Sequence, residues 1–292
     1  MSRRIPAFAF LGAFLALSTL SASGQQPDVR IAGSASTKPL LTGLALAMKH
    51  DKGLRVAIDT DPTSLDALDA LAQDKAGIAL VTKPLTLEDR SQYPDLAFVT
   101  IPIGMEVVAL GVSDDLWNAG LHTITREAMR GIYEHKITNW RDAGGPDEKV
   151  TLFNFPEGQG VWEMFAEWLY GDNRKAPLPK LNRVASNEDA RDALEFTPGS
   201  ISPIAVLFVD GARCHALGIQ LPDRVVRPTP EEVAAGNYPI VRPISAMVVG
   251  RPVLAIHTVT EFLTSPGGQA LVRKSGAFGL DAVPKPPPDS GY

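Results

Sequence analysis

The sequence predicts an α/β protein of two lobes, with mainly parallel sheets and a cleft between the lobes. Short apolar β-like segments alternate with segments of helical periodicity, which is typical of parallel sheets covered by helices. Two longer β-like runs, residues 97–113 and 238–250, are each interrupted by proline. Runs of this kind are suited to carry the chain from one lobe to the other and back. They divide the chain into one lobe of residues 27–102 plus 244–284 and another of residues 103–243.

The first lobe is expected to begin with a strand at residues 28–33, followed directly by a helix. Ser36 or Thr37 is a suitable N-cap, and Pro39 suits the first turn because its missing N–H is not needed there. The apolar stripe of this helix has helical spacing and consists of Leu40, Leu41, Leu44, Ala45 and Met48. Two further strands, at residues 54–61 and 76–86, enclose a helix that carries Leu65, Leu68 and Leu71.

The second half of the chain repeats this alternation. We expect strands at residues 149–155 and 199–210, and a helix with a turn at residues 125–140. A further helix places four apolar residues on one face: Trp162, Phe165, Ala166 and Leu169. This spacing indicates core packing rather than a ring-stacking role. A final helix carries Val259, Phe262 and Leu263.

The two ends of the chain are not expected to belong to the fold. Residues 1–24 are typical of a secretory signal peptide, because Arg3 and Arg4 precede an uncharged apolar run and small residues follow it. The run is short for a membrane span, and an uncleaved anchor helix is the alternative. We therefore expect a periplasmic protein with no membrane insertion after signal removal. Residues 285–292, rich in proline, are expected to form a disordered tail.

The charge balance limits the classes of partner. Without Arg3 and Arg4, 26 basic residues remain against 33 acidic ones. This acidic balance argues against nucleic acid and anionic membranes as partners. It does not exclude a small anion, because backbone amides in a cleft act locally. The only cysteine, Cys214, cannot form an internal disulfide, so the fold must depend on its apolar core.

The sequence does not contain the residue patterns of common enzyme classes. The five histidines have no metal-ligand spacing, and no nucleophile elbow, Walker loop or dinucleotide fingerprint occurs. The sequence therefore predicts a protein that is not an enzyme and needs no cofactor or metal.

Polar residues gather instead where predicted strands lead into helices. Free backbone N–H groups and the positive end of the helix dipole make such junctions suitable for anions, and hydroxyls add donors. Ordinary N-capping explains any one of them, but several at the carboxyl ends of strands indicate a binding cleft. The residues concerned are Ser34, Ser36 and Thr37 before the first helix, Thr63 and Ser64 before the second, and Gly158, Gln159 and Gly160 before the helix that carries Trp162.

Several segments resemble the phosphate-type substrate-binding proteins of ABC transporters, which have the bilobal periplasmic-binding-protein fold (type II). "IAGSASTKPLLTGLA" resembles the opening strand, serine-rich loop and helix of that family, and "AGIALVTKPLTLED" resembles its A-D-I-G-x-x-S-R-P-L-T segment. "MRGIYEHKITNWRDAGG" is close to its I-F-x-G-K-I-T-N-W signature. "NEDARDALEFTPGSISPI", "YPIVRPISAMV" and "FLTSPGGQALVRKSGAFGL" match later motifs, so the resemblance runs from about residue 29 to residue 280.

The chain departs from the family at the expected ligand loop, where R-x-x-G-S-G-T is usual. Here "FNFPEGQGVWEMF" places Asn154 or a neighbour at the arginine position and Gly158–Gln159–Gly160 at the Ser-Gly-Thr turn, while Glu157 adds a carboxylate. Thr82 and Lys83 stand where Ser-Arg is usual. A charge-assisted arginine contact is worth about 1.5–3 kcal/mol, so its loss predicts weak phosphate binding. If so, Asn154→Arg with Glu157→Ser would strengthen phosphate binding by about tenfold or more.

The resemblance implies a periplasmic solute-binding protein that captures phosphate or another small oxyanion between its lobes, with an ABC permease as the candidate protein partner. The implied ligand-binding residues are Ser34, Ser36, Thr37, Ser64, Thr82, Lys83, Gly158, Gln159 and Gly160, with Lys38 as a further candidate charge. The alternative is a cleft repurposed for an accessory or signalling protein that recognises a partner and binds phosphate weakly or not at all. A secreted hydrolase on the same fold is a third hypothesis, but no catalytic constellation supports it.

Overall fold

The computed structural model describes residues 26–61, 63–83, 86–177, 182–209, 211 and 213–285. The predicted signal peptide at residues 1–24 lies outside these ranges, as does the predicted tail apart from Lys285. Within the described part of the chain, no helix has both the length and the apolar composition that a membrane span requires.

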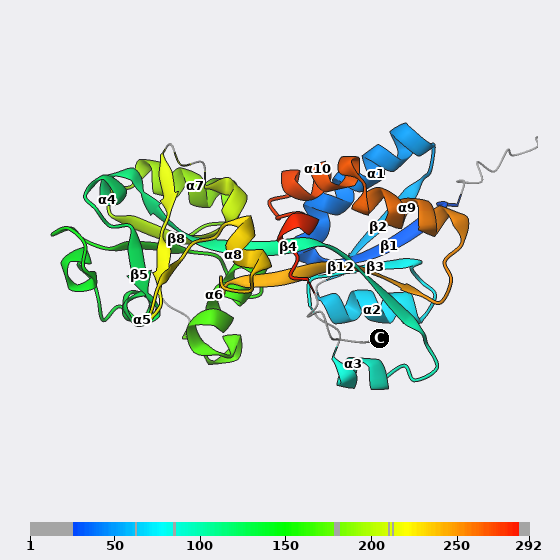
Figure 1. The fold of residues 1–292 in the computed structure, drawn as a ribbon, viewed down its shortest axis with the longest axis horizontal. Coiled ribbons are helices and arrows are strands. Elements are labelled where there is room, and N and C mark those ends of the chain that lie inside the picture. The colour runs from blue at the N-terminus through cyan, green and yellow to red at the C-terminus, as the bar shows by residue number, and fades with distance from the viewer. Residues whose placement is uncertain are drawn as a thin grey trace, which may run out of the picture.

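Two lobes lie side by side and are joined by two long strands (Figure 1). Lobe 1, on the right of that view, combines segments from both ends of the described chain. Its strands are β1 (Val29–Ser34), β2 (Val56–Asp61) and β3 (Ile78–Val81). Its helices are α1 (Lys38–Lys52), α2 (Ser64–Ala72), α3 (Leu87–Ser91), α9 (Leu254–Thr264) and α10 (Pro266–Lys274), and the 3-10 turn η1 (Ala35–Thr37) precedes α1.

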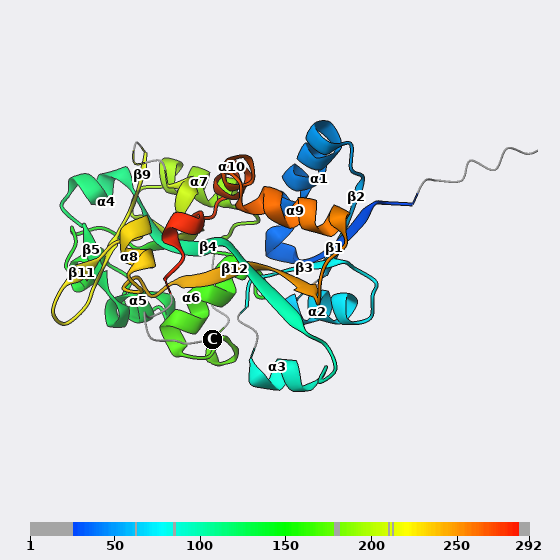
Figure 2. The ribbon, with the colours of Figure 1, turned by 45° about the vertical axis from the view of Figure 1, so that its right-hand side comes forward.

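Lobe 2 is built from the middle of the chain, and its small strands β5, β9 and β11 lie at the end of the molecule away from lobe 1 (Figure 2). Its helices are α4 (Asp114–Asn118), α5 (Arg126–Tyr133), α6 (Gly160–Tyr170), α7 (Asn187–Phe196) and α8 (Pro230–Ala234). Its strands are β5 (Thr123–Thr125), β6 (Thr151–Asn154), β7 (Asn182–Arg183), β8 (Ser200–Ala205), β9 (Cys214–Ala216), β10 (Gly218–Gln220) and β11 (Val225–Val226). Short 3-10 turns lie at Trp140–Ala143, Asn173–Lys175, Val206–Phe208 and Leu280–Ala282.

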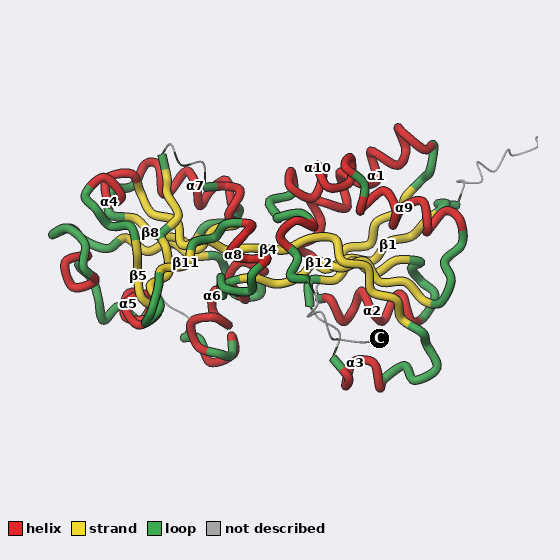
Figure 3. Tube along the Cα trace, in the orientation of Figure 1, coloured by secondary structure: helices red, strands yellow, loops and turns green. Residues whose placement is uncertain are grey.

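The two joining strands are β4 (Phe98–Ser113) and β12 (Val241–Val249), which correspond to the long β-like runs of the sequence. They pair with each other in antiparallel register from Phe98↔Val249 to Val107↔Val241, and β4 then continues along β8 in lobe 2. The strand path is therefore continuous through both lobes, in the order β2-β1-β3-β12-β4-β8-β6-β7. A second, three-stranded sheet in the order β11-β10-β5 belongs to lobe 2 (Figure 3).

This topology confirms the predicted two-lobed α/β fold and corrects one detail of it. Pairing is parallel within β2-β1-β3 and within β8-β6-β7, as expected. Pairing is antiparallel wherever a crossover strand takes part, so the two parallel parts are joined through β12 and β4 rather than forming two separate sheets.

Helices cover both faces of the lobe 1 sheet, and the alternation along β3 shows how. Ile78 and Leu80 face a core shared with α1, α9 and α10, whereas Ala79 and Val81 face a second core against α2. Successive residues of a strand point to opposite faces, so a strand covered on both sides is apolar throughout. Figure 3 shows α1, α9 and α10 on one side of the sheet and α2 on the other.

The core of lobe 2 confirms that the predicted aromatic stripe packs inside. Trp162, Phe165, Ala166 and Leu169 are all buried, together with Trp140, which is fully buried. This core also takes in Phe278, whose backbone bridges to Met105 on β4. The exact division of the chain at residues 102/103 and 243/244 stays a prediction.

Candidate functional site

A cavity of about 920 Å³ opens where several parallel strands end. The segments that follow β1, β2, β3 and β6 all contribute to its lining, together with the start of β12. The carboxyl ends of parallel strands lie at the same edge of a sheet, and this edge is where α/β proteins bind ligands. The lining residues are Ser36, Thr63, Ser64, Leu65, Thr82, Lys83, Gly158, Gln159, Gly160, Glu163, Met164, Glu167, Trp168, Asn173, Pro239, Val241 and Arg242.

The loop after β1 places Ser36 at the cavity, whereas its neighbour Thr37 is not part of the lining. Thr37 holds the N-cap position of α1, yet its side chain makes no capping hydrogen bond. It is buried, and its hydroxyl packs against Gly33, where a Cβ would overlap it. Ser34 ends β1, and its side chain is not described. Of this hydroxyl-rich loop, Ser36 is the residue that the cavity lining includes.

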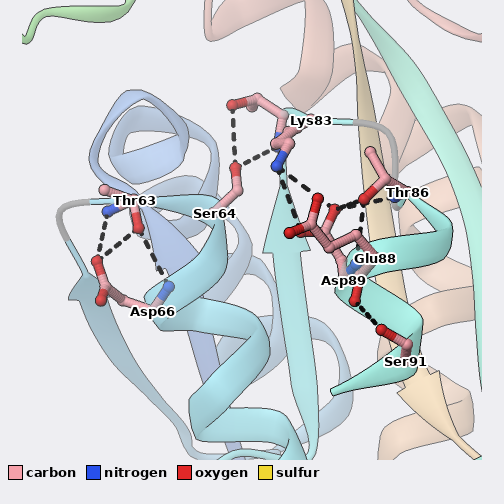
Figure 4. A network of polar contacts seen from close by, with 9 residues as sticks. Thr63, Ser64, Asp66, Lys83, Thr86, Glu88, Asp89 and Ser91 are labelled. Atoms are coloured by element: carbon pink, nitrogen blue, oxygen red, sulfur yellow. Dashed lines mark hydrogen bonds and ion pairs between the residues drawn. The ribbon is translucent and has the colours of Figure 1, made fainter. Parts of the chain in front are cut away.

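Side chains of this same segment supply hydrogen-bond partners for backbone amides at the start of α2 (Figure 4). The Thr63 hydroxyl accepts from the Asp66 amide at 3.1 Å, and the Asp66 carboxylate accepts from the Thr63 amide at 3.1 Å, forming a capping box. Asp66 therefore already supplies the negative charge that this helix terminus favours. Thr63 and Ser64 both line the cavity, and that this junction contributes to anion binding stays a prediction.

Ser64 connects α2 to the end of β3. Its hydroxyl accepts from the backbone amide of Thr82 at 3.0 Å, as Figure 4 shows. The Thr82 side chain is buried, whereas the Ser64 side chain is half-buried at the cavity wall. The two hydroxyl oxygens of Ser64 and Thr82 also lie 3.5 Å apart, and either can be the donor. These contacts fix the relative position of two lining segments.

Lys83 lines the cavity, but a carboxylate from α3 partly neutralises it. Its Nζ lies 3.4 Å from Asp89, which also accepts from the Thr86 amide at 2.9 Å and from the Thr86 hydroxyl at 2.7 Å. Burial opposes ionisation of Asp89, but the bonds from Thr86 and the charge of Lys83 outweigh it and hold the pKa of Asp89 below its usual value. The positive charge that Lys83 brings to the cavity is therefore already paired with the carboxylate of Asp89.

The N-terminus of α6 faces the cavity without a capping side chain. Gln159 is its N-cap residue and makes no side-chain capping bond, and Gly158 before it adopts φ 82°, a conformation that favours glycine. A Cβ at Gly160 would overlap Nη2 of Arg242 and approach the Cβ of Ser36 to 3.3 Å. Glycine at this position lets the two lobes touch, with Ser36 on one side and α6 on the other.

Asn154, the first candidate for the position of the family's arginine, is not among the residues that line the cavity. It is buried in lobe 2, where its Oδ1 accepts from the Phe155 amide at 2.9 Å and its Nδ2 donates to the Tyr133 hydroxyl at 3.5 Å. Trp162 Nε1 also donates to that hydroxyl, at 3.1 Å. Burial raises the pKa of Tyr133, which stays a neutral acceptor. Asn154 thus belongs to a hydrogen-bond network inside lobe 2. An arginine side chain at this position would begin in the core of lobe 2 and not at the cavity wall.

An arginine does reach the cavity from a different element. Arg242, near the start of β12, lies opposite Glu106 of β4 in the strand register, and its Nε donates to that carboxylate. Its Nη1 donates to Glu163 of α6 at 3.3 Å. Arg242 is not among the site residues that the sequence predicts, although the segment "YPIVRPISAMV" that contains it matches a family motif.

The rest of the lining combines an apolar wall with acidic side chains. The apolar residues are Leu65, Met164, Trp168, Pro239 and Val241, and Glu163 and Glu167 lie one turn apart on α6. Among the residues that the structure describes, no three His, Cys, Asp or Glu side chains are grouped to hold a metal ion. What this arrangement offers is hydrogen-bond donors, two cations and their carboxylate partners.

The predicted site residues are thus brought together for the most part. Ser36, Ser64, Thr82, Lys83, Gly158, Gln159 and Gly160 line one cavity. Thr37 is buried outside the lining, Lys38 is exposed outside it, and the side chain of Ser34 is not described. That these residues bind a ligand stays a prediction.

Two curated relatives and one solved structure define what the chain is similar to. The phosphate-binding protein PstS of Bacillus subtilis (strain 168) is 25% identical over 226 residues, 75% of this chain and 70% of its own length. The phosphate-binding protein PstS of Borreliella burgdorferi is 25% identical over 269 residues, 86% of this chain and 90% of its own. The crystal structure of an ABC-type phosphate transport receptor from Vibrio cholerae has a TM-score of 0.68 at 21% identity, over 86% of this chain and 99% of that one.

These likenesses confirm the resemblance to phosphate-type binding proteins that the sequence motifs indicated. A family described as the PBP superfamily domain matches residues 20–266, which is most of the chain. The chain therefore belongs to the PBP superfamily.

Proposed function

We propose that this protein is a periplasmic solute-binding protein that holds phosphate or another small oxyanion in the cavity between its lobes. The observation that carries the proposal is the convergence of donors at one place. Ser36 after β1, Ser64 beside the end of β3, and the uncapped start of α6 after β6 all line the same cavity. Hydroxyls and free helix amides are donors suited to an oxyanion.

The relatives support the class of ligand and the kind of partner. Both PstS proteins are named as phosphate-binding, and the Vibrio cholerae protein is called a transport receptor of the ABC type. We propose the same role here: reversible binding without catalysis, followed by delivery to an ABC permease. The predicted signal peptide at residues 1–24 supports a periplasmic location.

The proposed ligand contacts come from both lobes. Lobe 1 supplies Ser36, Ser64, Thr82 and Lys83, and lobe 2 supplies Gly158, Gln159 and Gly160. Bending in β4 and β12 would open and close the lobes around the ligand, because these are the strands that join them.

A second candidate function is a repurposed cleft that recognises a partner rather than a free anion. One observation favours it: both cations in the lining, Lys83 and Arg242, are already paired with carboxylates. The donors that converge on the cavity oppose it, because a surface that only contacts a partner does not require them.

A thermal-shift screen of the mature protein tests the proposal. Phosphate, sulfate, molybdate and small carboxylates are added separately, with chloride at equal ionic strength as the control. An anion at a hundred times its Kd stabilises the folded state by about 2.7 kcal/mol, which raises Tm by several degrees. A rise for at least one oxyanion supports the proposal. No rise for any of them at millimolar concentration contradicts it and favours the repurposed cleft.

A further inference from the structure

The guanidinium of Arg242 occupies a position where the cavity, both crossover strands and α6 meet. Its side chain is 19% exposed, so it is largely enclosed but still reached from the cavity. Nε is directed to Glu106 and Nη1 to Glu163, while Nη2 lies against Gly160 at the start of α6. Nη2 is thus directed toward the helix terminus where the proposed oxyanion would lie.

The two carboxylate partners of Arg242 are not equivalent. Glu106 faces it directly across the β4–β12 pair and is 18% exposed. Glu163 is 39% exposed, lines the cavity itself, and is 3.3 Å from Nη1. An enclosed cross-strand pair holds the arginine in place, whereas a solvated pair is worth only about 0–1 kcal/mol and is easily exchanged.

We infer that Arg242 is the anion-binding guanidinium of this cavity and that Glu163 is its resident counter-ion, which a bound oxyanion displaces. The inference rests on the proposed function and assigns a specificity-determining pair to that site. It also accounts for the substitution at Asn154: the charge that the family's loop supplies comes here from β12, on the opposite side of Gly160.

The geometry of the guanidinium explains how the exchange would work. Glu106 holds Nε and so fixes the plane of the guanidinium, while Nη1 and Nη2 form the edge nearest the start of α6. An oxyanion at that edge would accept two parallel N–H bonds, a geometry that arginine offers and lysine does not. The anion would have to compete with the tethered carboxylate of Glu163, which disfavours weakly accepting anions.

Isothermal titration calorimetry on four proteins tests this assignment: the wild type, Glu163→Gln, Glu167→Gln and Arg242→Lys. The titrant is the oxyanion with the largest effect in the thermal screen, or inorganic phosphate if none has an effect. Glu167→Gln is the matched control, because Glu167 also lines the cavity one turn along α6 and its hydrogen-bond partner is the Asn173 amide rather than Arg242. Melting curves of each variant establish that it is folded.

Glu163→Gln is expected to bind the anion about tenfold more tightly than the wild type, since the competing carboxylate is gone. Glu167→Gln removes the same charge without freeing Arg242, so its gain should stay within about twofold, which is less than about 0.5 kcal/mol. Arg242→Lys keeps a positive charge beside Glu106 but loses the two parallel N–H donors of the guanidinium. The affinity of this variant for the anion should therefore fall about tenfold or more.

The outcomes separate the two proposals. Equal gains in Glu163→Gln and Glu167→Gln, or unchanged affinity in folded Arg242→Lys, would overturn the assignment while leaving the proposed function standing. Binding in Glu163→Gln but not in the wild type would support the assignment and show that Glu163 blocks the site. Absence of binding in all four folded proteins would overturn both.

Discussion

Replacing Asn154 with arginine, which is one of the two changes that would restore the family's loop pattern, is expected to destabilise the protein rather than improve its binding. Asn154 is 2% exposed, and its Oδ1 is the acceptor for the Phe155 amide. Arginine has no acceptor atom, so that amide loses its partner at a cost of about 1–3 kcal/mol. A guanidinium buried without a carboxylate adds about 3–5 kcal/mol.

Together these losses amount to roughly 4–8 kcal/mol, which is comparable with the whole stability of a typical domain. At about 2–4 °C per kcal/mol for a chain of this size, Tm should fall by roughly 10 °C or more. Differential scanning calorimetry of the mature protein measures this directly. The control is Glu157→Arg, which introduces the same side chain three residues later at an exposed position and should change stability by less than about 0.5 kcal/mol.

The result that would refute this reasoning is an Asn154→Arg protein that melts with the wild type and binds phosphate at least about tenfold more tightly. The long side chain would then have reached the cavity with its charged end, and the sequence-based expectation for Asn154→Arg with Glu157→Ser would be right after all.

Three further predictions concern single side chains. Ser36→Ala should weaken oxyanion binding by about 1 kcal/mol, measured by calorimetry; Ser91→Ala, whose hydroxyl donates to the Glu88 carbonyl away from the cavity, should leave it unchanged. Asp89→Asn should lower Tm at neutral pH, because the pKa of Asp89 is lowered in the folded state and its ionised form therefore stabilises the fold. The difference in Tm should disappear as the pH falls below the usual pKa of aspartate and Asp89 becomes protonated. Burial, and then the neighbouring Asp115, raise the pKa of Glu148, so its ionised form destabilises the fold. Glu148→Gln should therefore raise Tm at pH values above the usual pKa of glutamate and leave Tm unchanged at pH values below it. Melting curves between pH 3 and pH 8 test both signs, and equal shifts at all pH values would contradict them.

Much of the fold could be predicted because its elements follow local rules. The expected strand at residues 28–33 is β1 (Val29–Ser34), and the long run at residues 97–113 is β4 (Phe98–Ser113). The stripe of α1 is buried at Leu40, Leu41, Leu44 and Met48, with Pro39 in the first turn as expected. Periodicity and helix-start chemistry suffice for such elements, since they depend on residues close in sequence.

The site was harder to predict where it depends on strand register or on which face of a strand a residue occupies. Arg242 lies at the cavity because β12 pairs with β4, which places Arg242 opposite Glu106 and beside α6. Its own neighbours in sequence do not indicate this pairing. The burial of Asn154 is weakly indicated by the sequence around it. Asn154 is two residues from Leu152, and in a strand such residues share a face, so both are buried in β6. Family position suggested the cavity for Asn154, but the alternation of β6 placed its side chain in the core.

The most direct test of the central claim is a crystal structure of the mature protein grown with the oxyanion that stabilises it most. The account predicts one anion in the cavity, within hydrogen-bond distance of Ser36, the first amides of α6 and the guanidinium of Arg242, with Glu163 moved away. An anion bound elsewhere, or a cavity that stays closed around an intact Arg242–Glu163 pair at saturating anion, would contradict it.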